Sequence, residues 1–420
     1  MVAGLGQLYR DYPQSFWTLV GATFVDRVGG AVLFPFFALY VTSKFGVGMT
    51  EAGLFFTVLA ASRLVGGVLG GALTDRFGRL TILVIGLAAS GLASLGIGLA
   101  PSFALLFLFD AFAGFFGAIG QPAQEAMVAD LLPAEKQADG FAVLRVVGNL
   151  AIAVGPAIGG FIAARSYLAL FVIDAVASLI TVALVIWLLR ETKPALEEDD
   201  EEDSLSKTVR GYGHVLRDAR FMGFVLTMIL LTMGYSQIFN TLSVYLRDVH
   251  SVPEQQYGWL ISVNAAMVVL LQFSVTRRAT RSRPLRVMVI GALLYAAGLA
   301  LFGLAASYGL FVLAVVIATL GELLVQPTAH ALVARFAPQM MRGRYMAIYG
   351  FTWPVAQGIG PLAAGIIMDN ADPRLVWYAG AALAVAAAAG FWRLAGGDTA
   401  PAAPDVPAVP RRLQRRGPGI

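Results

Sequence analysis

Apolar residues fill long stretches of the chain, and polar or turn-forming residues interrupt them at regular intervals. Each stretch has the length of about 18–25 residues that a helix needs to cross a bilayer. In lipid, backbone N–H and C=O groups find partners only within helices or closed barrels. We therefore predict an all-α integral membrane protein with twelve transmembrane helices, at residues 16–41, 51–73, 80–100, 102–126, 138–163, 168–190, 221–246, 256–276, 285–306, 308–334, 342–368 and 373–394.

One long polar stretch separates the sixth predicted helix from the seventh. It contains seven consecutive acidic residues, from Glu197 to Asp203, and basic residues follow them. Such a charge run is typical of a solvated linker. The predicted organisation is a six-helix bundle at 1–190, a cytoplasmic acidic linker at 191–220, a second six-helix bundle at 221–395, and a disordered tail rich in Pro and Arg at 396–420.

The two halves of the chain share an internal repeat with an offset of 205 residues. Several matches fall in this one register, which indicates two pseudo-symmetric bundles in the same orientation. Parallel repeats of this kind are typical of transporters whose halves rock around a central site. The matched pairs are Gly155-Pro156 with Gly360-Pro361, Gln121-Pro122 with Gln326-Pro327, Pro133 with Pro338, and Gly160 with Gly365.

Composition and charge distribution support the membrane class. Hydrophobic residues make up 58% of the chain and charged residues 13%, whereas soluble domains contain about 25% charged residues. Most of the 30 Lys and Arg residues fall on one side of the predicted helices, which places both termini in the cytoplasm and argues against nucleic-acid binding. The exceptions are Lys44, Arg165, Arg247 and Arg374 on the other side, and Arg27, Arg63 and Arg145 within helices.

Little in the sequence suggests catalysis or a bound cofactor. The chain has no Cys, its three His residues (His214, His250 and His330) are far apart, and no Ser/His/Asp arrangement is apparent. The phosphate-binding motif of nucleotide-driven pumps does not occur. We expect a protein that is not an enzyme, that has no cofactor or metal, and that uses an ion gradient, with protons as the coupling ion.

The loop between the second and third predicted helices carries a specific motif, Gly71-Ala72-Leu73-Thr74-Asp75-Arg76-Phe77-Gly78-Arg79-Leu80. It resembles the signature loop of the major facilitator superfamily. The resemblance implies a transporter of the bacterial inner membrane, monomeric, with a charged cytoplasmic gate that stabilises the outward-facing state. Asp130, at the end of the fourth helix, matches the acidic partner of that gate. The gate residues are therefore Gly71, Asp75, Arg76, Gly78, Arg79 and Asp130.

A second motif, Gly155-Pro156-Ala157-Ile158-Gly159-Gly160, resembles the fifth-helix motif of the drug–proton antiporter branch of this family. The resemblance implies export, with Gly155, Pro156, Gly159 and Gly160 as a hinge. Close helix packing without directional meaning is the alternative. The match is partial, because Ala142 and Ala151 stand where the longer form of the motif has Gly.

The fourth helix departs from the family pattern, because Asp110 stands where Arg is usual. The proton relay built on that Arg therefore cannot be transferred unchanged. Arg27, next to Asp26 in the first helix, is a candidate partner for Asp110 if both helices line the central cavity.

Glu322 is the strongest candidate for proton coupling, with Asp26 and Asp110 as secondary candidates. An ionisable residue in the hydrocarbon region is expensive and marks function by default. Glu322 lies near the middle of the tenth predicted helix, and its counterpart in the repeat is Gly117, so the acid is not part of the shared scaffold. An acid at this place resembles that of a drug-exporting member of the family. A carboxyl satisfied by neighbouring groups, without a role in transport, is the alternative.

The sequence thus predicts a proton-coupled exporter of amphipathic small molecules that works by alternating access. An exporter of one metabolite, such as a sugar, an amino acid or a lysolipid, is the alternative. Aromatic and polar side chains in the helices suit bulky cations, through dispersion and cation–π contacts. The candidate cavity residues are Arg27, Tyr235, Gln237, Asn240, Asn264, Trp353 and Gln357.

Overall fold

The computed structural model describes residues 12–193, 212–279, 282–338 and 341–396. In these residues all the regular secondary structure is helical, and twelve helical segments are long and apolar enough to cross a membrane. The chain is therefore an all-α, multi-pass membrane protein, as predicted. The acidic run from Glu197 to Asp203 and the Pro- and Arg-rich tail beyond Gly396 lie outside the described residues, so the predictions for them stand untested.

The helices follow the predicted spans to within a few residues at most ends. The first half contains α2 (Gln14–Leu33), η1 (Phe34–Phe36), α3 (Phe37–Phe45), α4 (Met49–Phe77), α5 (Arg79–Leu99), α6 (Phe103–Leu131), α7 (Ala134–Ala163) and α8 (Tyr167–Leu188). The second half contains α10 (Ala219–Asn240), α11 (Leu242–His250), α12 (Glu254–Ala279), α13 (Pro284–Leu304), α14 (Tyr308–Phe336), α15 (Arg342–Gly350), α16 (Thr352–Asn370) and α17 (Leu375–Gly396).

Three of the spans are interrupted, which the hydropathy pattern did not indicate. Pro35 lies in the short 3-10 segment that separates α2 from α3, where its missing N–H and fixed φ disfavour a regular α-helix. The seventh span breaks at Thr241, whose hydroxyl donates to the Gln237 side chain at 2.6 Å. The eleventh breaks at Phe351, between α15 and α16.

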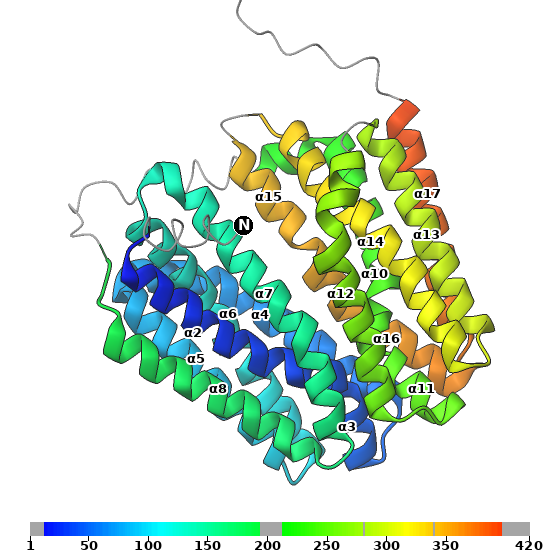
Figure 1. Ribbon diagram of the computed structural model, residues 1–420, viewed down its shortest axis with the longest axis horizontal. Coiled ribbons are helices and arrows are strands. Elements are labelled where there is room, and N and C mark those ends of the chain that lie inside the picture. The colour runs from blue at the N-terminus through cyan, green and yellow to red at the C-terminus, as the bar shows by residue number, and fades with distance from the viewer. Residues whose placement is uncertain (1–11, 194–211, 280–281, 339–340, 397–420) are drawn as a thin grey trace, which may run out of the picture.

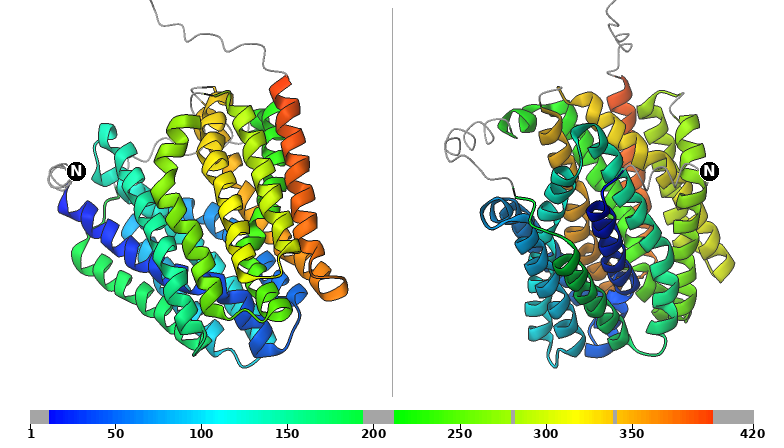
Figure 2. Two further views of the ribbon diagram at one scale, coloured as in Figure 1. Left: turned by 45° about the vertical axis from the view of Figure 1, so that its right-hand side comes forward. Right: turned by 60° about the vertical axis from the view of Figure 1, so that its left-hand side comes forward.

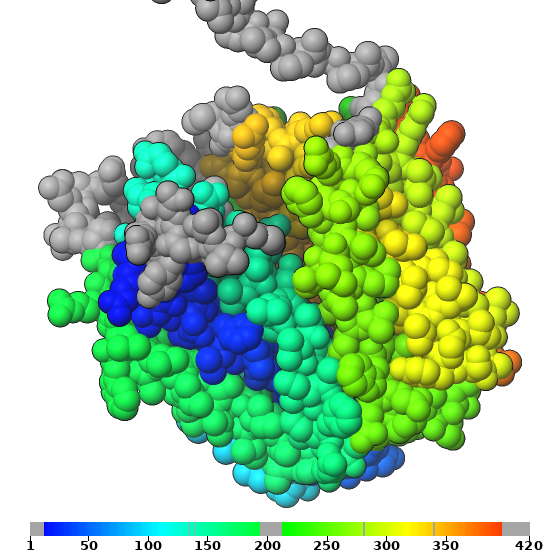
Figure 3. All heavy atoms as spheres, viewed as in Figure 1, coloured from blue at the N-terminus to red at the C-terminus, as the bar shows by residue number. Residues whose placement is uncertain are grey.

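The bundles converge at one face of the molecule and diverge toward the other (Figures 1 and 2). We call the face that carries the start of α2 and the end of α17 the terminal face, and the opposite face, which carries α3 and α11, the distal face. Helix α4 packs against α16, and α7 packs against α12. Figure 3 shows the atoms of α7 and α12 meeting along the lower part of the molecule, toward the distal face.

The contacts between the halves confirm the repeat in three dimensions. A Cβ at Gly258 of α12 would lie 2.6 Å from the carbonyl oxygen of Pro156, and one at Gly53 of α4 would lie 2.6 Å from that of Pro361. Gly53 and Gly258 are 205 positions apart, as are Pro156 and Pro361. The same Gly–Pro crossing thus occurs twice, related by the pseudo-symmetry of the halves.

Hydrogen bonds join the halves near the distal face. The Asp369 carboxylate accepts the backbone N–H groups of Met49 at 2.9 Å and Thr50 at 2.7 Å, at the start of α4. Arg247 donates to the Ser43 hydroxyl at 2.5 Å, and Tyr167 donates to the Glu254 carboxylate at 2.9 Å.

Closer to the middle of the bundle, the Thr57 hydroxyl donates to the Gly358 carbonyl at 2.5 Å. These contacts between the halves thus extend from the distal face to the middle of the molecule, and beyond them the helices of the two bundles diverge (Figures 1 and 2). The two halves are therefore in contact at the distal face, and their helices diverge toward the terminal face (Figures 1 and 2); we call this arrangement the open conformation.

Candidate functional site

Glu322 lies at the centre of a polar cluster in the second half. Its Oε2 atom accepts a hydrogen bond from the Tyr235 hydroxyl at 2.5 Å and another from the Asn264 amide at 2.8 Å. The same amide donates to the Thr319 hydroxyl at 2.9 Å, and the ring of Tyr295 packs on Tyr235 with centroids 4.5 Å apart. Helices α10, α12, α13 and α14 therefore converge on one carboxyl group.

The surroundings of Glu322 suit a group that changes its charge state. Glu322 lies among many protein atoms, and the residue as a whole is half-buried. Its hydrogen-bond donors, Tyr235 and Asn264, are 3% and 5% exposed, so both lie in the interior of the second half. A carboxylate that accepts two donors is stabilised as the charged form, whereas the low dielectric of its surroundings favours the neutral one. The two effects oppose each other at this position.

Asp110, in α6, is the most completely buried carboxyl group described in the first half, with 1% exposure. Its Oδ2 atom has no hydrogen-bond partner among the described residues, and the charged group with which it interacts is Arg63 of α4. The expected pairing with Arg27 is wrong, because no ion pair joins these two described residues. Arg27 is exposed, on a face of α2 that also brings it close to Arg63.

Asp26, also in α2, faces α8. The Ser178 hydroxyl donates to its Oδ1 atom at 2.9 Å, and a second carboxyl group, that of Asp174, lies one turn away on α8. Gly29 lets the two helices approach, since a Cβ there would lie 2.8 Å from that of Ala177. Asp26 and Asp110 are therefore separately placed and do not join the Glu322 cluster, and their predicted role in coupling stays a prediction.

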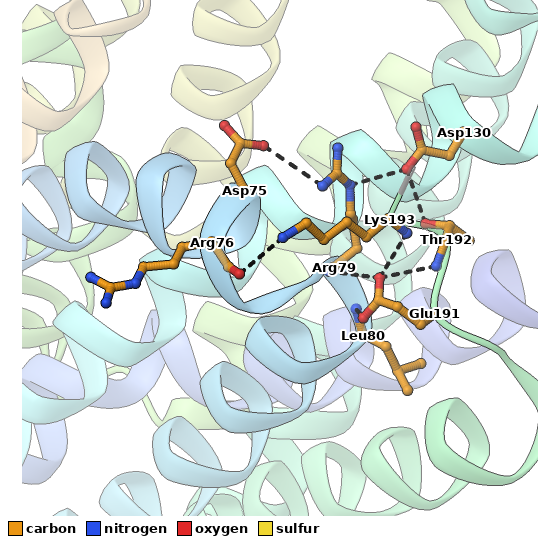
Figure 4. Close-up of polar contacts among 8 residues, drawn as sticks. All are labelled: Asp75, Arg76, Arg79, Leu80, Asp130, Glu191, Thr192 and Lys193. Atoms are coloured by element: carbon orange, nitrogen blue, oxygen red, sulfur yellow. Dashed lines mark hydrogen bonds and ion pairs between the residues drawn. The ribbon is translucent and has the colours of Figure 1, made fainter. Parts of the chain in front are cut away.

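The predicted gate residues meet at the terminal face (Figure 4). Arg79 at the start of α5 binds Asp130 with 3.1 Å between Nε and Oδ2, and its NH1 atom lies 3.8 Å from the Asp75 carboxylate. The Asp75 side chain is 70% exposed, so it remains available to another partner. Arg76 points away, and its carbonyl accepts the Lys193 ammonium at 3.0 Å.

Glu191, just after α8, completes this cluster and was missed by the sequence reasoning. Its carboxylate accepts the backbone N–H of Arg79 at 2.9 Å and of Leu80 at 3.1 Å, so it caps α5. The residue before the helix is Gly78 with φ 99°, which has no side chain to act as a cap. Burial raises the pKa of Glu191, but hydrogen bonds from four backbone N–H groups outweigh it, so the pKa lies below its usual value.

The gate cluster belongs wholly to the first half in this open conformation. Its members come from the α4–α5 turn, the end of α6 and the segment after α8. Gly71 faces open space, because a Cβ there would have no neighbour within 4 Å among the described residues, whereas a Cβ at Gly78 would collide with the Glu191 carboxylate. The gating role itself stays a prediction.

The predicted hinge of α7 lies at contacts with other helices. A Cβ at Gly155 would lie 2.5 Å from that of Ala31, and one at Gly159 would collide with the carbonyl oxygen of Val32. A Cβ at Gly160 would lie 2.9 Å from the Glu254 carbonyl, in the other half. Pro156 lies inside a helix that continues past it. These residues allow close packing on both sides of α7, and their role in bending stays a prediction.

Most of the candidate substrate residues are packed in this conformation. Gln237, Asn240 and Gln357 are buried, and the Asn240 amide donates to the Gln357 side chain across α10 and α16. Tyr235 and Asn264 donate hydrogen bonds to the Glu322 carboxyl group. Trp353, with 40% exposure, and Arg27 present accessible surface. Their contact with a substrate stays a prediction.

Comparison with known proteins decides the family. The sequence profile described as "Major Facilitator Superfamily" matches residues 19–253 and 246–418, which is almost the whole chain. The protein belongs to the major facilitator superfamily. The resemblance on which the gate residues were chosen is therefore confirmed, and so is the fold class.

Two relatives of this chain have names that state different transport activities. A protein of Planococcus maritimus named "Na(+), Li(+), K(+)/H(+) antiporter" is 29% identical over 396 residues, covering 88% of this chain and 91% of its own. The "Multidrug resistance protein MdtH" of Shigella flexneri is 22% identical over 357 residues, covering 83% of this chain and 86% of its own.

Solved structures share the fold at low sequence identity. The nucleoside transporter NupG has a TM-score of 0.79 at 14% identity, with 91% of this chain and 100% of that one covered. A bacterial homologue of the human lysosomal transporter Spinster, in an inward-facing and occupied conformation, has a TM-score of 0.74 at 15% identity, with 91% and 96% covered.

Proposed function

We propose that this transporter is a proton-coupled exporter of amphipathic small molecules, and that Glu322 carries the proton. The observation that supports this most is the cluster in which Tyr235 and Asn264 hold one carboxyl group inside the second half. The partial antiporter motif of α7 and the relatives named as antiporters and as multidrug resistance proteins support export. These relatives are similar to this chain, and their names do not define its substrate.

The proposed exchange cycle depends on the orientation that the charge distribution favours. With the terminal face in the cytoplasm, as the positive-inside rule predicts, the present conformation faces inward. A proton released from Glu322 to the cytoplasm frees a negative charge that favours a cationic substrate. In the outward state a new proton binds Glu322, and the substrate leaves. The proton and the cationic substrate thus compete for the negative charge of the Glu322 carboxylate, and such competition is what exchange requires.

The proton gradient supplies enough free energy for such exchange. Each proton that returns releases about 2.3 kcal/mol per 100 mV of membrane potential. A pH difference adds about 1.4 kcal/mol per unit. One or two protons per cycle would sustain a substrate gradient of roughly ten- to a thousandfold.

Exchange of monovalent cations for protons is a second candidate function. The Planococcus relative is named as an antiporter of this kind. In addition, the first half contains a small pocket that is lined by the carboxyl group of Asp26 and by neutral side-chain oxygens. Export of a single metabolite, the alternative that the sequence left open, has no such observation in its favour.

Transport into inside-out membrane vesicles tests the proposal. With a proton gradient imposed, we expect uptake of fluorescent amphipathic cations that a protonophore abolishes. Glu322→Gln should reduce the gradient-driven uptake by at least about tenfold, because Gln cannot take up or release a proton. Glu135→Gln is the matched control, since this exposed carboxyl group in the first turn of α7 lies outside the Glu322 cluster. Equal uptake by both variants would contradict the proposal.

A further inference from the structure

A small pocket lies inside the first half, away from the Glu322 cluster. Its volume is about 30 Å³, enough for one or two water-sized occupants. The lining comes from four helices that pack around it, with α2 held between α7 and α8 (Figure 1). The lining residues are Leu19, Ala22, Thr23 and Asp26 of α2, Leu83 and Leu87 of α5, Gln124 of α6, and Thr181 and Val185 of α8.

The polar part of the lining presents oxygen atoms from three helices. Thr181 donates its hydroxyl proton to the carbonyls of Ala22, at 3.1 Å, and Ala177, at 2.9 Å. Thr23 donates to the Leu19 carbonyl at 2.7 Å. Both hydroxyl protons are therefore directed to backbone carbonyls, which leaves oxygen lone pairs as the groups that these side chains offer.

Gln124 and Asp26 complete the oxygen set. The Gln124 amide nitrogen donates to the Thr23 hydroxyl, so its carbonyl oxygen is not needed for that contact. Ser178 donates to the Oδ1 atom of Asp26, which leaves the Oδ2 atom of the same carboxyl group. Carboxylate, amide and hydroxyl oxygens are the ligands that hard cations prefer. A pocket that presents these acceptors suits a cation better than an anion.

The charge of the pocket selects a monovalent occupant. Asp26 supplies one negative charge, and the other polar lining groups are neutral. The charged groups that face Asp26 from its surroundings are Arg27 on its own helix and Asp174 on α8, which oppose each other in sign. The residues that α5 and α6 contribute are uncharged, and α7 contributes none to the lining. A divalent cation would leave excess positive charge in a low dielectric.

We propose that this pocket binds a small monovalent cation, Na⁺ or Li⁺, through Asp26, Thr23, Gln124 and Thr181. Apolar side chains, among them Leu83, Leu87 and Val185, form the rest of the lining. The pocket lies within about two turns of the terminal-face ends of α5 and α8.

The inference deepens the second candidate function and rests on it for any role in transport, whereas binding can be measured without transport. The experiment is equilibrium binding of radiolabelled Na⁺ to the purified full-length protein in detergent, at one fixed pH. We expect saturable binding that unlabelled Na⁺ and Li⁺ displace. Asp26→Asn should weaken binding by more than about tenfold, since one charged ligand is lost.

A pair of variants at position 181 separates ligation from packing. Thr181→Val keeps the shape but removes the oxygen, so binding should weaken by about tenfold; Thr181→Ser keeps the oxygen and should bind as the wild type does. Both should elute as folded, monodisperse protein. This pair decides the question even if Asp26→Asn does not fold.

The Glu322→Gln variant distinguishes this inference from the proposed proton coupling. It should bind Na⁺ like the wild type, because Glu322 lies in the other half. The absence of saturable Na⁺ binding would show that the pocket holds water only and would overturn the inference, as would equal binding by Thr181→Val and Thr181→Ser. Either result would leave the role of Glu322 in proton coupling unaffected.

Discussion

Asp369, at the end of α16, fastens the two halves together at the distal face, and its replacement tests how the open conformation is held. The carboxylate accepts two backbone N–H groups at the start of α4, from Met49 and Thr50. These N–H groups have no partner within the helix, and they lie at the positive end of its dipole. Gly48 just before them gives the carboxylate room, since a Cβ there would lie 2.5 Å from it. The contact can exist only while the distal face is closed.

The size of the effect follows from these two hydrogen bonds. A hydrogen bond to a charged group contributes about 1.5–3 kcal/mol when it is buried, and partial exposure reduces this. Asp369 is exposed, and Asn at this position would keep one acceptor oxygen but lose the charge. We expect Asp369→Asn to favour the conformation that is open at the distal face by about 1–2 kcal/mol. The ratio of molecules open at the distal face to molecules open at the terminal face should therefore rise roughly 5–30-fold.

Pulsed electron paramagnetic resonance measures this ratio directly. The chain has no Cys, so spin labels can be attached at introduced cysteines without first removing native ones. Ser102 and Ala306 suit the labels, because both are exposed in distal-face loops, one in each half. The control is Asp372→Asn, which changes an exposed carboxyl group nearby that accepts the Arg374 N–H instead. If Asp369→Asn and Asp372→Asn gave the same distance distribution, the role of Asp369 in holding the distal face closed would be refuted.

Three further predictions address the symmetric crossing and the gate cluster. Gly258→Leu and Gly53→Leu should each shift the same distance distribution toward the form that is open at the distal face, because either side chain would collide with a facing carbonyl oxygen; opposite shifts would contradict the pseudo-symmetry. Glu191→Gln should lower the Tm by about 1–3 °C at neutral pH. Because the pKa of Glu191 is lowered in the folded protein, its stabilising effect is present above the usual pKa of about 4.3 and is lost as the pH falls through the lower folded value, so wild type and variant should converge in acid; a constant difference would argue against this. Arg79→Lys should weaken transport without unfolding the protein, since the single 3.1 Å contact to Asp130 depends on the guanidinium geometry; unchanged transport rates would remove Arg79 from the gate.

The sequence predicted the helices and the repeat well because both have strong physical signals. Apolar length determines a transmembrane helix, and the Gly–Pro crossings place the same residue types at both copies of one contact. Asp75, Arg79 and Asp130 could be assigned to one cluster from the sequence because the resemblance to the family relates the loop motif to an acidic residue at the end of the fourth helix. These are local or repeated features, which a single sequence can display.

Other parts of the site depend on contacts that no local pattern reveals. Glu191 was assigned to the linker by its polar neighbours, and only the fold shows that it caps a helix whose preceding residue is glycine. Asp110 was expected to pair with Arg27 of α2, but the charged group with which it interacts is Arg63 of α4. The hydrogen bond from Met49 to Asp369 joins segments about 320 residues apart, and no sequence motif marks these positions.

The central claim, that solute and proton exchange through Glu322, is tested most directly in proteoliposomes that start with no pH gradient. An outwardly directed gradient of a transported amphipathic cation is imposed, and internal pH is recorded with a trapped dye. We predict that solute efflux acidifies the lumen of wild-type vesicles, and that Glu322→Gln still exchanges labelled solute for unlabelled solute but moves no protons. Solute efflux without acidification in the wild type, or undiminished acidification with Glu322→Gln, would contradict the account.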